Sequence, residues 1–246
     1  MNLLELVPRD LYSLKTEVHH LLNRFPQLSG INIPDVLRLP TRSTDAVYSL
    51  LSENILAIPH IRAIDLPLET SINNIKNLVK KGLTHILIIS GDIPQKPNQE
   101  LYNVTPTQLI KTLAAELPNL KIYAGLDPYR QSFKEEFAYC QEKLDAGANG
   151  FFTQPFFDPH LAEIFLDQFK TCEIFIGISP VLTETSLHYW TEKNNAIFPS
   201  DFVPNLNHSI SIAKKLTALA NTYKQSTYHM PIKVDPELYL EGVFKD

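Results

Sequence analysis

Four polar side chains stand inside or directly after short apolar segments of the sequence. Glu5 lies within LLELV, and His60 lies within IPHIRAID. Asp92 follows HILIISG, and Gln154 follows GFFT. Carboxyl and imidazole groups transfer protons, and a carboxamide both donates and accepts hydrogen bonds. These residue types fit acid–base chemistry on a polar ligand with several contacts better than the binding of a single metal ion.

Further polar residues occur in or after the other apolar segments. They are Asp35, Asp65, Asp127, Thr153, Ser179 and His229. Taken singly, an aspartate after a strand is often a turn or helix-cap residue. A functional role follows only if these side chains converge, and the carboxyl ends of parallel strands do deliver side chains to one rim.

The sequence excludes several other classes of function. It lacks G-x-G-x-x-G, P-loop, H-E-x-x-H, C-x-x-C and G-x-S-x-G motifs, so no metal site is expected. The two cysteines, Cys140 and Cys172, cannot form a disulfide framework. With 22 basic and 27 acidic residues the net charge is −5, and a nucleic-acid partner is not expected. No apolar run reaches the ~18 residues of a membrane span, and we expect a cytoplasmic protein.

The hydrophobic pattern places these residues on alternating strands and helices. Apolar segments predict strands over 3–7, 30–33, 56–64, 85–89, 121–126, 150–153, 173–178 and 228–230. Amphipathic segments predict helices over 10–25, 43–51, 70–81, 105–117, 132–146, 159–170, 186–194, 209–224 and 236–241. This α/β pattern and length are typical of a (β/α)8 TIM barrel, and we expect one domain over residues 1–246. A doubly wound open sheet shares the local pattern, but the sequence lacks a glycine-rich first turn.

One long segment and several shorter ones resemble a known enzyme family. The segment DAGANGFFTQPFFD (145–158) closely resembles the D-A-G-A-N-x-x-x-T-Q-x-F-F-D signature of 5,10-methylenetetrahydrofolate reductases. Shorter resemblances, in the family's order, are LELVP around Glu5, IPHIRAID around His60, ISGDIPQ with Glu100 and Tyr102, and GISPVLT. Together they cover nearly the whole chain, from about residue 3 to the final helix.

The resemblance implies a TIM barrel that binds FAD non-covalently. It also implies use of NADH or NADPH to reduce 5,10-methylenetetrahydrofolate to 5-methyltetrahydrofolate. By motif position, Glu5 matches the catalytic acid that helps open the folate ring to an iminium, and Asp92 matches a carboxylate near flavin and pterin. Gln154 matches a residue that positions the substrate ring. His60 matches a flavin contact, and Lys143 matches a basic contact to the flavin phosphates.

Three further residues join the expected site. Phe156 belongs to an aromatic cluster that can form a flat wall beside the substrate ring. The flavin-facing tyrosine of the family aligns best with Leu126, with Tyr129 close by as the expected cofactor contact. Ala148, within the DAGAN segment, is likewise expected at the cofactor.

Two departures from the family pattern concern the phosphates of the cofactor. Ser90 and Glu142 stand where the family carries arginines. A charged contact to phosphate is often worth more than ~1.5 kcal/mol, so the resemblance implies weakened FAD binding here. Arg42, Arg62 or Arg130 are the candidates to supply the missing positive charge.

Three functions follow from this pattern. The first is a flavin-dependent reductase of the methylene folate. The second is a reductase that has lost the flavin and takes hydride directly from the nicotinamide. The third is a non-catalytic barrel that binds a folate or a protein partner. Family members are often oligomers, so a homo-oligomer is compatible with each of the three.

Overall fold

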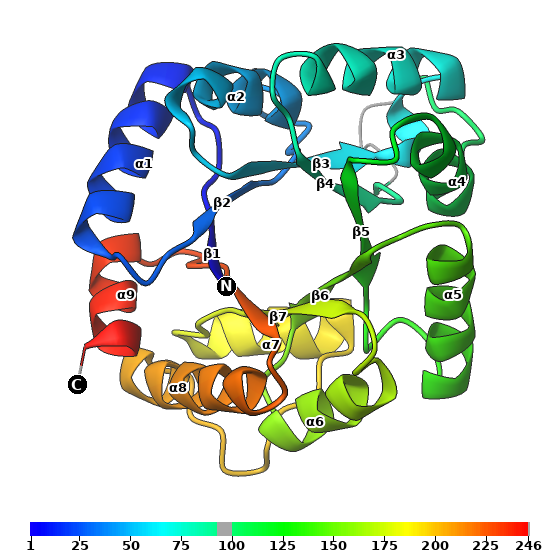
Figure 1. The fold of residues 1–246 in the computed structure, drawn as a ribbon. Coiled ribbons are helices and arrows are strands. Elements are labelled where there is room, and N and C mark those ends of the chain that lie inside the picture. Colours follow the sequence, from blue (N-terminus) through cyan, green and yellow to red (C-terminus); the bar gives the residue numbers. More distant parts are fainter. Residues whose placement is uncertain (93–99, 246) are drawn as a thin grey trace.

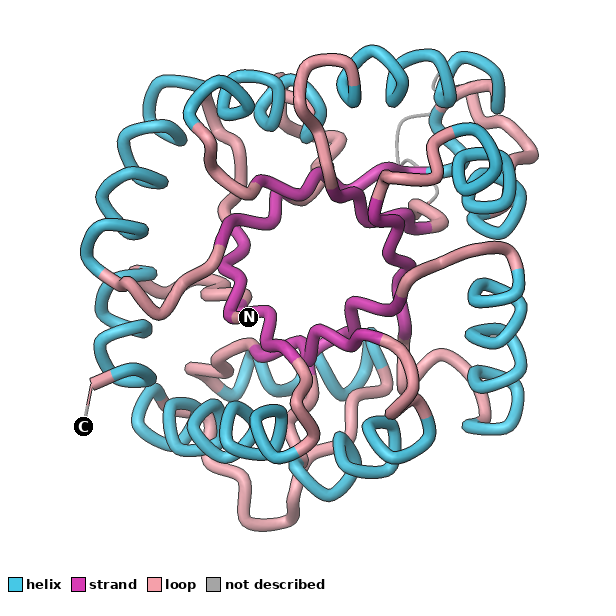
Figure 2. The backbone as a smooth tube through the Cα atoms, viewed as in Figure 1, coloured by secondary structure: helices cyan, strands magenta, loops and turns pink. Residues whose placement is uncertain are grey.

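Eight parallel strands form a closed barrel in chain order, from β1 to β8. The computed structural model describes residues 1–92 and 100–245. Figure 1 shows the helices outside the ring of strands, and Figure 2 shows the same ring closing beside the N-terminus. Closure comes from the parallel pairing of β1 with β8, which an open sheet lacks. The predicted (β/α)8 TIM barrel is therefore confirmed.

Every predicted strand and helix occurs, four strands with the predicted bounds and the other elements with shifted ends. The strands are β1 (Asn2–Glu5), β2 (Gly30–Ile33), β3 (Ala57–Arg62), β4 (His85–Ile89), β5 (Lys121–Leu126), β6 (Gly150–Pro155), β7 (Glu173–Ile178) and β8 (Ser226–His229). The helices are α1 (Leu11–Arg24), α2 (Ser43–Leu50), α3 (Leu68–Val79), α4 (Pro106–Glu116), α5 (Phe133–Asp145), α6 (Pro159–Gln168), α7 (Glu184–Asn194), α8 (Leu206–Thr222) and α9 (Pro236–Phe244). Short 3-10 turns η1 (Leu51–Glu53) and η2 (Ala63–Asp65) follow α2 and β3.

The largest shifts are three residues, at the start of α8 and the end of α9, and several strand ends shift by two residues. β1 ends at Glu5 instead of residue 7, and β6 runs to Pro155 instead of residue 153. β8 begins at Ser226, two residues earlier than predicted, and ends at His229. The apolar pattern does not detect the polar residues and proline at the end of β6 and the start of β8, and it extends β1 over the apolar residues Leu6 and Val7.

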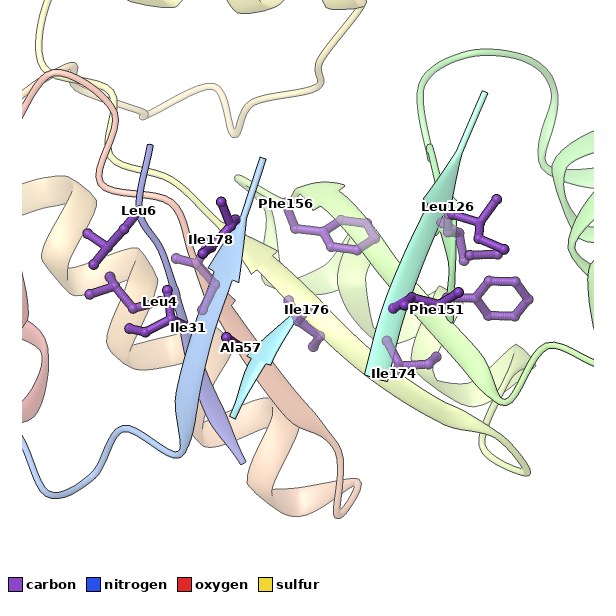
Figure 3. Close-up of a cluster of buried hydrophobic side chains, with 14 of the residues drawn as sticks. Leu4, Leu6, Ile31, Ala57, Leu126, Phe151, Phe156, Ile174, Ile176 and Ile178 are labelled. Atoms are coloured by element: carbon purple, nitrogen blue, oxygen red, sulfur yellow. The ribbon is translucent and has the colours of Figure 1, made fainter. Parts of the chain in front are cut away.

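The strands are apolar on both faces because each face meets its own core. Outward side chains such as Leu4, Ile31, Ile176 and Ile178 pack in the cluster between barrel and helices, part of which Figure 3 shows. Inward side chains form a second cluster inside the barrel: Leu3, Ile58, Leu87, Tyr123, Phe152, Phe175, Tyr228 and Met230. The side-chain period of two therefore separates inner from outer residues along each strand.

Local sequence signals fix the starts of the helices that follow strands. Thr105 and Gln108 form a capping box at α4, and Ser132 and Glu135 form another at α5. Such caps satisfy free backbone N–H groups and are each worth about 1 kcal/mol. Across residues 1–92 and 100–245, no helix is both long and apolar enough to cross a membrane.

Candidate active site

A cavity of about 490 Å³ opens at the carboxyl ends of the strands. This volume lies within the ~300–1,000 Å³ typical of sites for small molecules. Its charged and polar wall residues are Glu5, His60, Ser90, Asp92, Asp127, Arg130, Lys143, Thr153, Gln154 and Tyr228. The cavity thus unites Glu5, His60, Asp92, Lys143 and Gln154, which the sequence analysis selected from distant segments.

Apolar side chains from the barrel interior form the floor of the cavity. Leu87, Phe152 and Met230 belong to the interior cluster and also line the cavity. Below them, the Phe152 ring stacks on Phe175 with centroids 4.1 Å apart. Close packing at this level excludes water, so polar groups that reach the floor lose their hydration.

Glu5 brings a carboxyl group onto this floor. Leu3 belongs to the interior cluster and Leu4 to the outer one, so alternation turns Glu5 inward. The Tyr228 hydroxyl on neighbouring β8 donates a hydrogen bond to Glu5 Oε2. Burial raises the pKa of the Glu5 carboxyl to about 8. The group is therefore mostly protonated at neutral pH, and it can act as a general acid.

His60 on β3 adds a neutral imidazole next to this acid. Burial lowers the pKa of His60 to about 3. The His60 ring lies edge-on to Tyr228, with centroids 6.4 Å apart. Within the described part of the chain, its buried Nε2 atom has no hydrogen-bond partner. A ligand atom that bonds Nε2 would offset an unpaired-group penalty of ~1–3 kcal/mol.

The loop after β4 forms one side of the rim. Ser90, Gly91 and Asp92 line the cavity there, and residues 93–95 of the ISGDIPQ segment lie outside the described residues. Arg62 holds the loop from below, because its Nη2 donates to the Asp92 carbonyl at 2.6 Å and its Nε donates to Asp65 at 3.0 Å. Gly91 has φ +92°, and a Cβ there would lie 3.1 Å from the Arg62 guanidinium. Glycine thus lets the loop pass over Arg62 while Asp92 stays exposed.

Lys143 on α5 lines the cavity beside β5, the strand next to β4. Its Nζ donates to the Gly125 carbonyl at 2.7 Å and lies 3.8 Å from the centroid of the Tyr139 ring. Burial lowers the pKa of Lys143, with nearby acidic groups acting in the opposite direction. One of the three N–H donors of this ammonium group is therefore used inside the protein, and its charge also lies against the Tyr139 ring.

Arg130 is the candidate arginine that lines the cavity. Its Nη2 lies 2.7 Å from Glu136 Oε2, and the Glu136 side chain is 0% exposed. Arg42 instead pairs with Asp35 and Asp65, and like Arg62 it is absent from the cavity wall. Each of these arginines is thus paired with a carboxylate.

A β-bulge in β6 separates two residues that the sequence analysis placed together. Phe152 pairs with Phe175, but the next pair is Pro155 with Gly177, so β6 contains one extra residue. Gln154 lines the cavity with an exposed side chain. Phe156, after the bulge, turns outward and lies with Ile178 in the outer cluster (Figure 3). This placement corrects the expectation that Phe156 contacts the substrate.

Tyr129 and Ala148 also lie away from the cavity wall. The Tyr129 hydroxyl donates to the Pro155 carbonyl at 2.8 Å, so this residue ties the ends of β5 and β6 together in the core. Ala148 precedes β6, and its N–H donates to the Lys143 carbonyl where α5 ends. That turn is at the amino end of the strands, opposite the cavity. Contrary to the sequence prediction, neither Tyr129 nor Ala148 lines the cavity at which the cofactor was expected.

On β8 the inward residue is Tyr228, which the sequence analysis missed in favour of His229. His229 lies opposite the outward Ile178 of β7 and is fully buried. Its ring nitrogens contact Thr227 Oγ1 at 3.1 Å and the Tyr239 hydroxyl at 3.2 Å. Met230, two positions after Tyr228, lies in the same interior cluster, in keeping with the side-chain alternation of a strand.

Comparison with known families identifies the group to which this chain belongs. A sequence model described as methylenetetrahydrofolate reductase matches residues 38–220. The chain belongs to the methylenetetrahydrofolate reductase family. The matched span of this methylenetetrahydrofolate reductase family member contains His60, Asp92, Lys143 and Gln154. Glu5 precedes that span, so its assignment rests on the cavity geometry and the LELVP resemblance.

Curated relatives carry the same family name. The chain is 28% identical over 149 residues to the 5,10-methylenetetrahydrofolate reductase of Pectobacterium carotovorum subsp. carotovorum, covering 58% of this chain and 50% of the relative. It is 27% identical over 149 residues to that of Escherichia coli (strain K12), with the same coverage. The chain therefore spans about half the length of the curated relatives it matches.

Solved structures share the fold of this family member but little of its sequence. Oxaloacetate acetylhydrolase matches with a TM-score of 0.59 at 9% identity, covering 94% of this chain and 75% of that chain. The structure of 2,3-dimethylmalate lyase matches with a TM-score of 0.61 at 10% identity, covering 95% and 75%. At this identity the likeness concerns the barrel alone.

Proposed function

We propose that this chain reduces 5,10-methylenetetrahydrofolate to 5-methyltetrahydrofolate, with NADH or NADPH as the source of the hydride. One observation carries the proposal. In a member of this family, a carboxyl group with a pKa of about 8, that of Glu5, lies on the floor of a cavity whose rim holds Asp92 and Gln154.

The pterin of the folate fits the distribution of polar and apolar wall residues. Leu87, Phe152 and Met230 offer an apolar floor to a flat ring. Gln154 and Asp92 supply amide and carboxylate groups that match the donor and acceptor atoms on a pterin edge. In this arrangement the ring is held at its rim and the methylene bridge faces Glu5.

Glu5 supplies the proton that the reduction requires. Its O–H bond breaks and the proton passes to a nitrogen of the five-membered folate ring. The bond between that nitrogen and the methylene carbon then breaks, leaving an iminium that accepts hydride at carbon. Glu5 remains as a carboxylate that accepts the hydrogen bond from Tyr228. The electron pair of the new C–H bond comes from the nicotinamide.

The diphosphate of FAD does not fit the charges that the described residues place at the cavity. The positively charged wall residues, Lys143 and Arg130, are accompanied by Asp127 on the wall and by Glu136, which is paired with Arg130. Next to Arg130, an outer groove also contains Glu142. Among the described residues, two cations and at least two carboxylates leave this side without a net positive charge for a resident diphosphate.

This charge balance favours direct transfer of hydride from the nicotinamide over transfer through FAD. A donor that visits the site for one turnover needs less binding energy than a resident cofactor. Family membership supports transfer through FAD, whereas the charges at the cavity support direct transfer, so both routes are candidates.

Isotope transfer distinguishes the two candidates. Purified protein is first examined for a flavin spectrum, and any flavin is then removed. NADH carrying deuterium at C4 is supplied together with the methylene folate. Direct transfer retains deuterium in the methyl product in flavin-free protein, whereas restoration of activity by added FAD alone would exclude it. Binding of methylene folate without turnover, under both conditions, would contradict the reductase proposal and favour a non-catalytic folate-binding barrel.

A matched pair of variants tests the acid. Glu5→Gln should lose activity by ~10²-fold or more, since general acid catalysis contributes about 10²–10⁴-fold. Glu192→Gln, on the exposed surface of α7, should retain it. Equal activity of the two variants would show that Glu5 is not the proton donor.

A further inference from the structure

Asn32 on β2 is a buried amide beneath the cavity that the proposed reaction does not yet use. Its side chain is 0% exposed. Within the described part of the chain, neither Oδ1 nor Nδ2 has a hydrogen-bond partner. Its neighbours Ile31 and Ile33 belong to the outer cluster, so alternation turns Asn32 inward. A carboxamide whose oxygen and nitrogen are both buried without a hydrogen-bond partner lowers the stability of the fold. Such a group indicates an interaction with another polar group inside the barrel.

The strand register places Asn32 beside Glu5. Glu5 of β1 pairs directly with Asn32, and Asn32 pairs on its other side with Ile58 of β3. Neighbouring strands lie ~4.8 Å apart, and paired inward side chains stand next to each other. Of the described titratable groups near Glu5, the Tyr228 phenol of β8 donates to it, and the His60 imidazole of β3 lies edge-on to Tyr228 and lines the same cavity. Asn32 is thus the polar residue on the side of Glu5 away from Tyr228.

We propose that Asn32 is the positioning residue of Glu5 and serves both protonation states of its carboxyl group. This inference rests on the proposed function. The structure holds no Asn32–Glu5 hydrogen bond, and we expect one to form when the two side chains rotate about their last bonds. Asn32 Oδ1 then accepts the O–H of neutral Glu5 while Tyr228 donates to the other oxygen. After Glu5 has given its proton to the folate nitrogen, Asn32 Nδ2 donates to the resulting carboxylate.

The chemistry of the carboxamide explains why asparagine suits this position. One end of the group accepts and the other donates, so rotation about its last bond changes its role without displacing the backbone. A hydrogen bond to a carboxylate is about twice as strong as one between neutral groups. Asn32 therefore stabilises the ionised form of the Glu5 carboxyl more than the neutral form. This makes loss of the Glu5 proton easier, although burial disfavours a charge at this position.

A direct measurement of the Glu5 ionisation tests this role independently of activity. Protein labelled with ¹³C at glutamate carboxyls is titrated by NMR between pH 5 and pH 9. The Glu5 resonance is the one that Glu5→Gln lacks. His60 does not interfere, since its pKa of about 3 lies below this range. The variants are Asn32→Leu, the smaller Asn32→Ala in case leucine disturbs the barrel, and Ile58→Val as a packing control at the same level.

Loss of the amide should raise the pKa of Glu5 by roughly one unit, a tenfold weaker ionisation. The Ile58→Val control should leave it unchanged. At neutral pH, Asn32→Leu should also lower kcat about tenfold with little change in KM. An unchanged or lowered Glu5 pKa in both Asn32 variants would overturn the inference even if the protein is an active reductase. A raised pKa in a protein without reductase activity would instead leave the Asn32–Glu5 contact intact and refute the proposed function.

Discussion

Replacing Glu5 by glutamine is expected to change how the stability of the fold depends on pH. In the folded protein, burial raises the pKa of this carboxyl from 4.5 to about 8. Ionising it there costs about 5 kcal/mol more than in the unfolded chain, at ~1.4 kcal/mol for each tenfold change in ionisation. Glutamine has a similar shape and no charge, so the variant removes this cost.

The sign of the effect follows from which state holds the proton. Below pH 4.5 Glu5 is protonated in both states and contributes no pH dependence. Between pH 4.5 and about 8 the unfolded carboxyl is ionised while the folded one keeps its proton, so the free energy of unfolding falls as pH rises. Above this range both states are ionised, and the folded state carries the full cost. The other titratable groups are the same in wild type and in Glu5→Gln, so their contributions to the pH dependence of the unfolding free energy cancel in the comparison.

Urea unfolding of wild type and Glu5→Gln at pH 5, 6 and 7 measures this difference. The stability of the variant relative to wild type should increase by about 2.5 kcal/mol from pH 5 to pH 7. Glu192→Gln, which changes an exposed carboxyl on α7, should show a constant difference from wild type over the same range. A constant difference for Glu5→Gln as well would refute the assignment of Glu5 as a buried, protonated acid.

Three further predictions address other parts of the structure. Restoring the family's charges with Ser90→Arg and Glu142→Arg should tighten FAD binding at least tenfold, at ~1.5–3 kcal/mol per charged contact; unchanged quenching of flavin fluorescence would contradict the charge argument. Burial lowers the pKa of His229 to about 3, so wild type should lose about 2 kcal/mol relative to His229→Gln on acidification from pH 7 to pH 5 in urea unfolding. A Cβ at Gly150 would lie 1.9 Å from the Glu173 carbonyl oxygen. Gly150→Ala should therefore destabilise the β6–β7 pairing by roughly 3 kcal/mol or more, and a thermal midpoint equal to wild type would argue against this register.

The sequence by itself determined the order of elements and most of the polar residues that line the cavity. Strands β4 and β7 were predicted at their observed bounds, because strands buried on both faces appear as unbroken apolar runs. Glu5, Asp92 and Gln154 could be selected because strand ends in a parallel barrel share one rim, wherever the exact ends lie.

Only the tertiary structure decided which face each side chain occupies. Alternation gives relative orientation along a strand, but hydrogen bonds to neighbouring strands fix the absolute face. On β6 the bulge turns Phe156 outward, and on β8 the register turns Tyr228 inward in place of His229. The pairing of Arg130 with Glu136 and the position of Asn32 beside Glu5 depend on the same long-range geometry, because contacts through space do not follow from spacing along the chain.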